Sequence, residues 1–152
     1  MTKPVTVEFK FDDLEDYTDG FLIRVVHRAL ELVSFALRGG MVMEAPVKKG
    51  FLRGSIEEPV TLGTAHFGIN IGAFYWEFIQ FGTGLKGPKG RAYDIFPKTK
   101  KALRFVVGGQ VVFAKFVKDH PGQKPNPFVD RAIDGLDQVV PGAVSQALEE
   151  AA

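Results

Sequence analysis

The sequence has 152 residues, with 45% apolar and 24% charged residues, which is the size and composition of a soluble globular protein with its own hydrophobic core. It contains no cysteine, which excludes disulfides and thiolate metal sites, and no apolar run approaches the length of a membrane span. The formal net charge of +1 hides a segregation of charge, because residues 1–20 carry −4, residues 86–104 carry +6 and residues 125–152 carry −4.

The N-terminal part of the chain predicts a strand followed by a long helix. Residues 1–10 lack the apolar core of a signal peptide, so we expect the protein to be made in the cytoplasm and used there or assembled there into something larger. Polar and apolar residues alternate over Val5–Phe11, which predicts a half-buried strand. From about Leu14 to Met43, apolar residues recur every three or four positions, which predicts an amphipathic helix.

Two strands and a short helix are predicted next. The strands cover Glu57–Leu62 and Ala65–Ile71, on either side of a turn. Residues 73–81 are ambiguous, but the spacing of their apolar side chains fits a short helix that ends at Gly82. We expect four side chains to lock this helix into the core: Tyr75, Phe78, Ile79 and Phe81.

Residues 82–101 are predicted to form one long basic loop, because turn signals recur along them. A loop of this length in a compact domain usually has a function or is disordered when the protein is free. The loop and the residues that follow it carry seven basic residues, which we interpret as a partner-facing or subunit-facing surface: Lys86, Lys89, Arg91, Lys98, Lys100, Lys101 and Arg104.

The C-terminal part predicts a hairpin and a helix. Gly108-Gly109 is a strong two-residue turn signal between Leu103–Val107 and Val111–Val117, which predicts a β-hairpin. A final helix is predicted from Phe128 to Ala151, with a kink expected at Pro141. The fold class is therefore α+β, with a long N-terminal helix and a C-terminal helix packed on a mainly antiparallel sheet of four or five strands, in a single domain over residues 1–152.

The segment Gly82-Thr83-Gly84-Leu85-Lys86-Gly87 matches the G-x-G-x-x-G pattern of dinucleotide-binding enzymes. Such a loop must follow a strand and open a helix whose N-terminal amides bind the phosphate. Here Pro88 and Gly90 follow, and they do not propagate a helix. We therefore interpret the segment as a turn.

No constellation of catalytic or metal-binding residues is found in the sequence. No two of His27, His66 and His120 are three or four residues apart, as a helical zinc site requires. None of the serines at positions 34, 55 and 145 lies in a nucleophile elbow. We accordingly predict no catalytic residues, no metal and no cofactor, and a protein that is not an enzyme.

The charge segregation leaves several interpretations open. The basic centre and the acidic ends can pair within one chain or between subunits, or they can simply be solvated surfaces. The basic residues can also face nucleic acid. Interleaved aromatic residues are few there, so we expect at most non-specific contact with DNA.

Three segments, in order along the chain, resemble the tail-completion or head–tail joining proteins of long-tailed phages and prophages. They are residues 45–56 (APVKKGFLRGSI), residues 75–83 (YWEFIQFGT) and residues 127–132 (PFVDRA). The chain departs from the family at Lys49, where Thr is common, and at Gln80, where Glu is common. The motif residues to which the resemblance assigns structural roles are Pro46, Gly50, Leu52, Arg53, Ser55, Tyr75, Gln80, Gly82, Thr83, Pro127, Phe128 and Ala132.

The resemblance implies a structural virion protein that forms a ring, usually sixfold, in the neck between head connector and tail. It implies a homo-oligomer with connector and tail proteins as partners, no catalytic site and no membrane. A tail terminator or other minor tail protein that caps the tube remains an alternative of the same class. A small non-specific nucleic-acid-binding module is an alternative of a different class.

Overall fold

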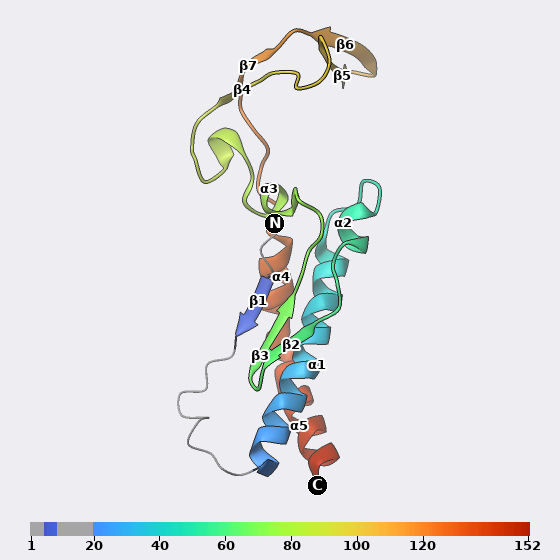
Figure 1. Ribbon diagram of the computed structural model, residues 1–152, viewed down its shortest axis with the longest axis vertical. Coiled ribbons are helices and arrows are strands. Elements are labelled where there is room, and N and C mark those ends of the chain that lie inside the picture. Colours follow the sequence, from blue (N-terminus) through green and yellow to red (C-terminus); the bar gives the residue numbers. More distant parts are fainter. Residues whose placement is uncertain (1–4, 9–19) are drawn as a thin grey trace. The chain divides into compact units, whose positions relative to one another are not determined.

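The computed structural model describes residues 5–8 and 20–152 (Figure 1). The chain divides into two compact units, which we name the scaffold unit, residues 1–76 with 127–152, and the basic unit, residues 77–126. The predicted α+β class is confirmed. Within the described residues, the strands form three small antiparallel sheets of three, two and two strands rather than one sheet.

Helices in the scaffold unit pack side by side. The longest helix, α1 (Gly20–Glu44), lies along α4 (Phe128–Asp134) and α5 (Val140–Ala151), as Figure 1 shows. The predicted apolar stripe is confirmed, and its buried members are Val25, Ala29, Leu30, Val33, Leu37 and Met41. The predicted start of the helix near residue 14 lies outside the described residues. Among the described helices, none is both long and apolar enough to cross a bilayer.

The predicted C-terminal helix is divided into three segments. A 3-10 turn, η3 (Gly135–Gln138), separates α4 from α5. The kink predicted at Pro141 is wrong, because Pro141 lies in the first turn of α5, where a residue without an amide hydrogen breaks no helical hydrogen bond.

A small sheet covers the other side of α1. Its strand order is β1 (Val5–Glu8), β3 (His66–Ile69) and β2 (Val60–Gly63), with both pairings antiparallel. Residues 9–11 of the first predicted strand lie outside the described part of the chain. The buried side chains of β3 pack toward α1, where the rings of Phe67 and His27 are 5.3 Å apart. β2 is an edge strand, and all four of its residues are exposed.

Two neighbouring glycines in α1 allow a matched test of how closely the helices pack. A Cβ atom at Gly40 would lie 3.2 Å from the Cβ of Ala132 in α4, whereas one at Gly39 would meet nothing within 4 Å. We expect Gly39→Ala to raise the free energy of unfolding by roughly 0.5–1 kcal/mol, the usual gain of Ala over Gly inside a helix. Gly40→Ala should forfeit this gain, because α4 must move away. Urea unfolding measures both, and equal stabilisation by the two variants would contradict the close packing.

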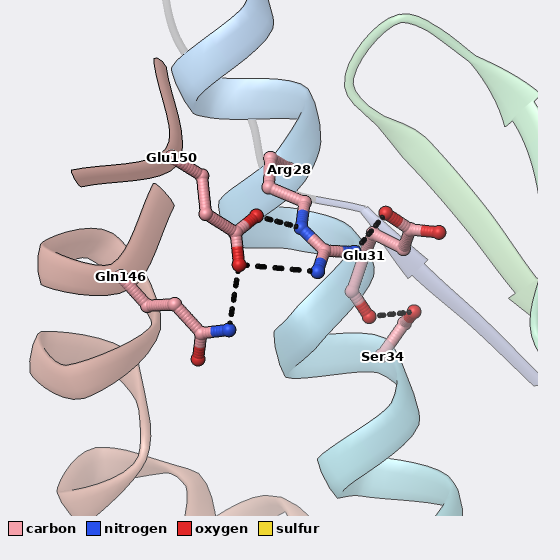
Figure 2. A network of polar contacts seen from close by, with 5 residues as sticks. All are labelled: Arg28, Glu31, Ser34, Gln146 and Glu150. Carbon is pink, nitrogen blue, oxygen red and sulfur yellow. Dashed lines mark hydrogen bonds and ion pairs between the residues drawn. The ribbon is translucent and has the colours of Figure 1, made fainter. Parts of the chain in front are cut away.

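A polar network joins the start of α1 to the end of α5 within the scaffold unit (Figure 2). Arg28 donates from Nε to Glu150 Oε2 at 2.6 Å and from Nη1 to Glu31 Oε2 at 2.7 Å. Gln146 Nε2 donates to Glu150 Oε1 at 2.8 Å. The hydrogen bonds from Arg28 and then Gln146 lower the pKa of Glu150. Because the side chains of Arg28 and Glu150 are 39% and 41% exposed, water screens their ion pair and its contribution to stability is small.

The basic unit consists of short elements. In chain order they are a helix that begins one residue before the unit, a 3-10 turn and four strands. Their bounds are α3 (Trp76–Phe81), η2 (Gly84–Lys86), β4 (Tyr93–Ile95), β5 (Leu103–Val107), β6 (Gln110–Ala114) and β7 (Val117–His120). The strands pair as β4 with β7 and β5 with β6. Residues 82–101, predicted as one loop, thus contain η2 and β4. The predicted second hairpin strand, Val111–Val117, is divided between β6 and β7.

The expectation for the side chains of α3 is wrong. Phe78 and Phe81 are 55% and 51% exposed, while Trp76 and Gln80 are buried. Residues 76 and 80 are one helical turn apart and share a face, so the buried face of α3 differs from the one that its aromatic residues predicted.

Candidate functional site

All seven predicted interface cations lie in the basic unit, and all are exposed: Lys86, Lys89, Arg91, Lys98, Lys100, Lys101 and Arg104. None of them forms an ion pair with another residue that the structure describes. The basic unit holds ten Lys and Arg against three Asp and Glu, a formal charge of +7, and the scaffold unit accordingly carries −6. The charge segregation seen in the sequence therefore follows the division into units.

The basic unit is held together by an interlock between two glycine turns, residues 82–85 and 121–123. The amide of Thr83 donates to the carbonyl of Gln123, and the amide of Leu85 donates to the carbonyl of Pro121, both at 2.9 Å. The amide of Gln123 donates back to Thr83 Oγ1 at 2.9 Å. These hydrogen bonds join the two turns directly, without a β-ladder between them.

Glycine is required in the interlock because the two backbones touch. A Cβ atom at Gly122 would lie 1.9 Å from the carbonyl oxygen of Thr83, and one at Gly84 would lie 2.5 Å from the carbonyl oxygen of Pro121. Both glycines also have positive φ angles, 85° and 65°. The amides of Thr83 and Leu85 are engaged in the interlock, so they do not form a phosphate cradle.

The hairpin of β5 and β6 exposes apolar side chains on both faces. Its predicted Gly108-Gly109 turn is confirmed, with φ angles of 56° and 84° as a primed two-residue turn requires. Alternation places Arg104, Val106, Val111 and Phe113 on one face, and Val107 and Val112 on the other. Val106 is 60% exposed and Phe113 is 66% exposed. Both outer edges of this ribbon lack a strand partner among the described residues.

The basic unit also holds a pocket of about 610 Å³. Aromatic side chains form much of its lining, and cations stand beside them: Glu77, Phe78, Phe81, Gly82, Thr83, Gly84, Pro88, Lys89, Arg91 and Tyr93. The combination of apolar rings with Lys89 and Arg91 suits a segment that carries both apolar and acidic side chains.

The first family-like segment closes the C-terminal end of α1. Arg53 donates from Nε to the carbonyl of Ala45 and from Nη2 to the carbonyl of Met43, both at 2.9 Å. These contacts satisfy carbonyls at the helix terminus and place a cation at its negative end. Gly50 takes a left-handed conformation before the short helix α2 (Phe51–Gly54), in which Leu52 is buried.

The remaining motif residues of the scaffold unit lie in turns or in the core. Phe128 is fully buried, and Ala132 is buried where α4 approaches Gly40. The hydroxyl of Ser55 donates to the carbonyl of Leu52 at 2.8 Å, and Pro127 accepts from the amide of Arg131 at 3.1 Å. Pro46 is half-buried, and the Tyr75 ring lies 6.2 Å from that of Phe51.

The motif residues of the basic unit are Gln80, Gly82 and Thr83. Gln80 is buried in α3, while Gly82 and Thr83 belong to the interlock. In both units, the motif residues therefore lie in turns, at helix ends or at buried positions.

Sequence reasoning missed the interlock and its neighbours Tyr93 and His120. The two rings lie 5.4 Å apart, His120 Nδ1 accepts from the amide of Gly122, and the Tyr93 hydroxyl is 3.4 Å from Thr83 Oγ1. Glycine in both turns was the available signal, but nothing in the sequence pairs segments about forty residues apart.

Within residues 5–8 and 20–152, no three His, Asp or Glu side chains gather as a metal-binding group. Comparison of the chain with protein-family models, curated proteins and solved structures finds no match.

Proposed function

We propose that this protein is a structural component of the neck of a long-tailed phage, where it oligomerises into a ring that joins the head connector to the tail. The observation that carries the proposal is the surface of the basic unit. Throughout residues 77–126, all of which are described, no apolar side chain is buried, while eleven large apolar side chains are exposed. A unit of this kind lacks a core of its own and gains stability when a partner covers it.

The distribution of charge supports assembly from copies of one chain. A ring needs head-to-tail interfaces, in which two different surfaces of the same protein meet. The basic unit, of charge +7, and the described part of the scaffold unit, of charge −3, supply two such surfaces, and their attraction both guides encounter and rejects pairing of like surfaces.

The ordered motifs support the phage assignment. They resemble the tail-completion family, and their residues lie in turns, helix ends and core positions. Residues in such positions stabilise a fold whose other surfaces are then free to contact neighbouring proteins. A sixfold ring in the virion is the form that the resemblance implies.

Deletion of the gene from the phage or prophage that carries it tests the proposal. We expect negative-stain images to show separate heads and tails, with joined particles restored by the wild-type gene supplied in trans. Normal tailed particles without the protein would overturn the proposal. Joined particles whose tails vary in length would instead favour the tail terminator.

A nucleic-acid-binding module is the second candidate, favoured by the ten cations of the basic unit. This function predicts an affinity for DNA that falls steeply as salt rises. The exposed valines and Phe113 of the hairpin are not explained by phosphate contacts, which is why we rank this function second.

A further inference from the structure

The hairpin of β5 and β6 is a strand pair without a sheet. It offers two unpaired strand edges among the described residues, and apolar side chains stand on both of its faces. An isolated two-stranded ribbon is marginally stable in water, and an exposed edge is a template for pairing with another strand. The hairpin is therefore suited to extend another sheet.

The scaffold unit presents a matching edge at β2. This strand is the outer strand of the β1–β3–β2 sheet, and Val60 and Leu62 on it are 56% and 52% exposed. Val60 pairs with Gly68, so these side chains lie on the face opposite to Phe67, the face that turns away from α1. A strand added beside β2 would find apolar cross-strand neighbours there.

A hollow of about 470 Å³ adjoins the same edge. It is lined by Ile23, Arg24, His27, Thr61, Gly63 and Thr64. The side chain of Val107, which lies on the opposite face of β5 from Val106, would point toward this hollow when Val106 lies beside Leu62.

Charge decides which surfaces meet. Two hairpins pairing with each other would bring together two units of charge +7, whereas a hairpin on β2 meets a unit whose described residues hold seven Lys and Arg against ten Asp and Glu, a charge of −3. The local charges agree with a parallel pairing, in which the N-terminal ends of the two strands meet, because exposed Glu57 and Glu58 precede β2, while Lys100, Lys101 and Arg104 lie before and within β5. β6 itself carries no charged residue, so β5 is the matching strand.

We propose that β5 of one copy pairs with the free edge of β2 in a second copy, so that the hairpin extends the neighbour's sheet. This inference rests on the proposed function, since it supplies the head-to-tail contact of the ring. The contact joins two different surfaces, so each copy gives its hairpin to one neighbour and its β2 edge to another.

Single cysteines test this pairing in the 152-residue chain, because its sequence contains none. Val106→Cys marks the hairpin, Leu62→Cys marks β2, and Ser145→Cys, on the exposed face of α5, is the control. Variants are mixed in pairs and treated with a short bismaleimide. We expect Val106→Cys with Leu62→Cys to give at least about tenfold more cross-linked dimer than either variant alone or Val106→Cys with Ser145→Cys, because docking raises the effective concentration of the two thiols.

Two results would overturn the inference. One is a dominant Val106→Cys homodimer, which means that hairpins pair with each other. The other is absence of the mixed cross-link, whether light scattering shows rings or monomers. Rings without this cross-link would reject the β2 contact and leave the neck function standing, since that function is tested by gene deletion.

Discussion

Replacing Gly122 with alanine is expected to destabilise the basic unit by at least about 3 kcal/mol. The new Cβ atom would lie 1.9 Å from the carbonyl oxygen of Thr83, and neither a Cβ atom, which is fixed by the backbone, nor a backbone carbonyl can rotate away. The positive φ of 85° adds a second cost, because alanine is disfavoured in this region. The interlock should therefore separate.

Gly90→Ala is the matched control for this substitution. Gly90 also has a positive φ, 58°, but nothing lies within 4 Å of an added Cβ atom. Alanine there should cost only about 1–2 kcal/mol, the backbone contribution alone. The difference between the two variants isolates the steric contact between residues 83 and 122.

Hydrogen exchange of three amides measures the result directly. The amides of Thr83, Leu85 and Gln123 make the hydrogen bonds of the interlock. We expect all three to lose protection in Gly122→Ala and to keep it in Gly90→Ala, while core amides of α1 change little in either. Unchanged protection in Gly122→Ala would show that the two turns are not in contact in solution.

The elements that the sequence predicted well depend on local patterns. The apolar stripe of α1 recurs with the helical period, and the hairpin turn needs only Gly108 and Gly109 with positive φ. The seven cations were expected on an accessible surface, and all are exposed. These features follow from residues that are close together in the chain.

The features that the sequence did not predict depend on contacts between distant segments. Strand β4 has three residues and no clear alternation, and it forms only because β7 lies beside it. The buried face of α3 was assigned to the aromatic residues, yet Phe78 and Phe81 are exposed. A prediction that places apolar residues inside fails where the surface itself is apolar.

The location of positive charge, rather than its amount, is expected to control self-association. We expect a variant with Lys98, Lys100 and Lys101 changed to Glu to associate at least about tenfold more weakly, because like charges would then face Glu57 and Glu58 of the neighbour. Its control changes Lys115, Lys118 and Lys124 to Glu, an equal change of charge at other exposed positions of the basic unit. The control should lose much less affinity.

The reciprocal variant tests whether the two surfaces meet each other. Glu57→Lys with Glu58→Lys should also weaken self-association, and mixing it with the Lys98, Lys100 and Lys101 variant should restore binding between the two proteins. Sedimentation at low and high salt measures each case, and the differences should shrink as the Debye length falls from about 30 Å at 0.01 M to about 3 Å at 1 M. Equal losses in the first variant and its control, with no restoration on mixing, would mean that only overall charge matters. Restoration confined to the mixture would instead identify the acidic residues that precede β2 as the surface that receives the basic unit of the next copy, which is the contact that a ring of identical subunits requires.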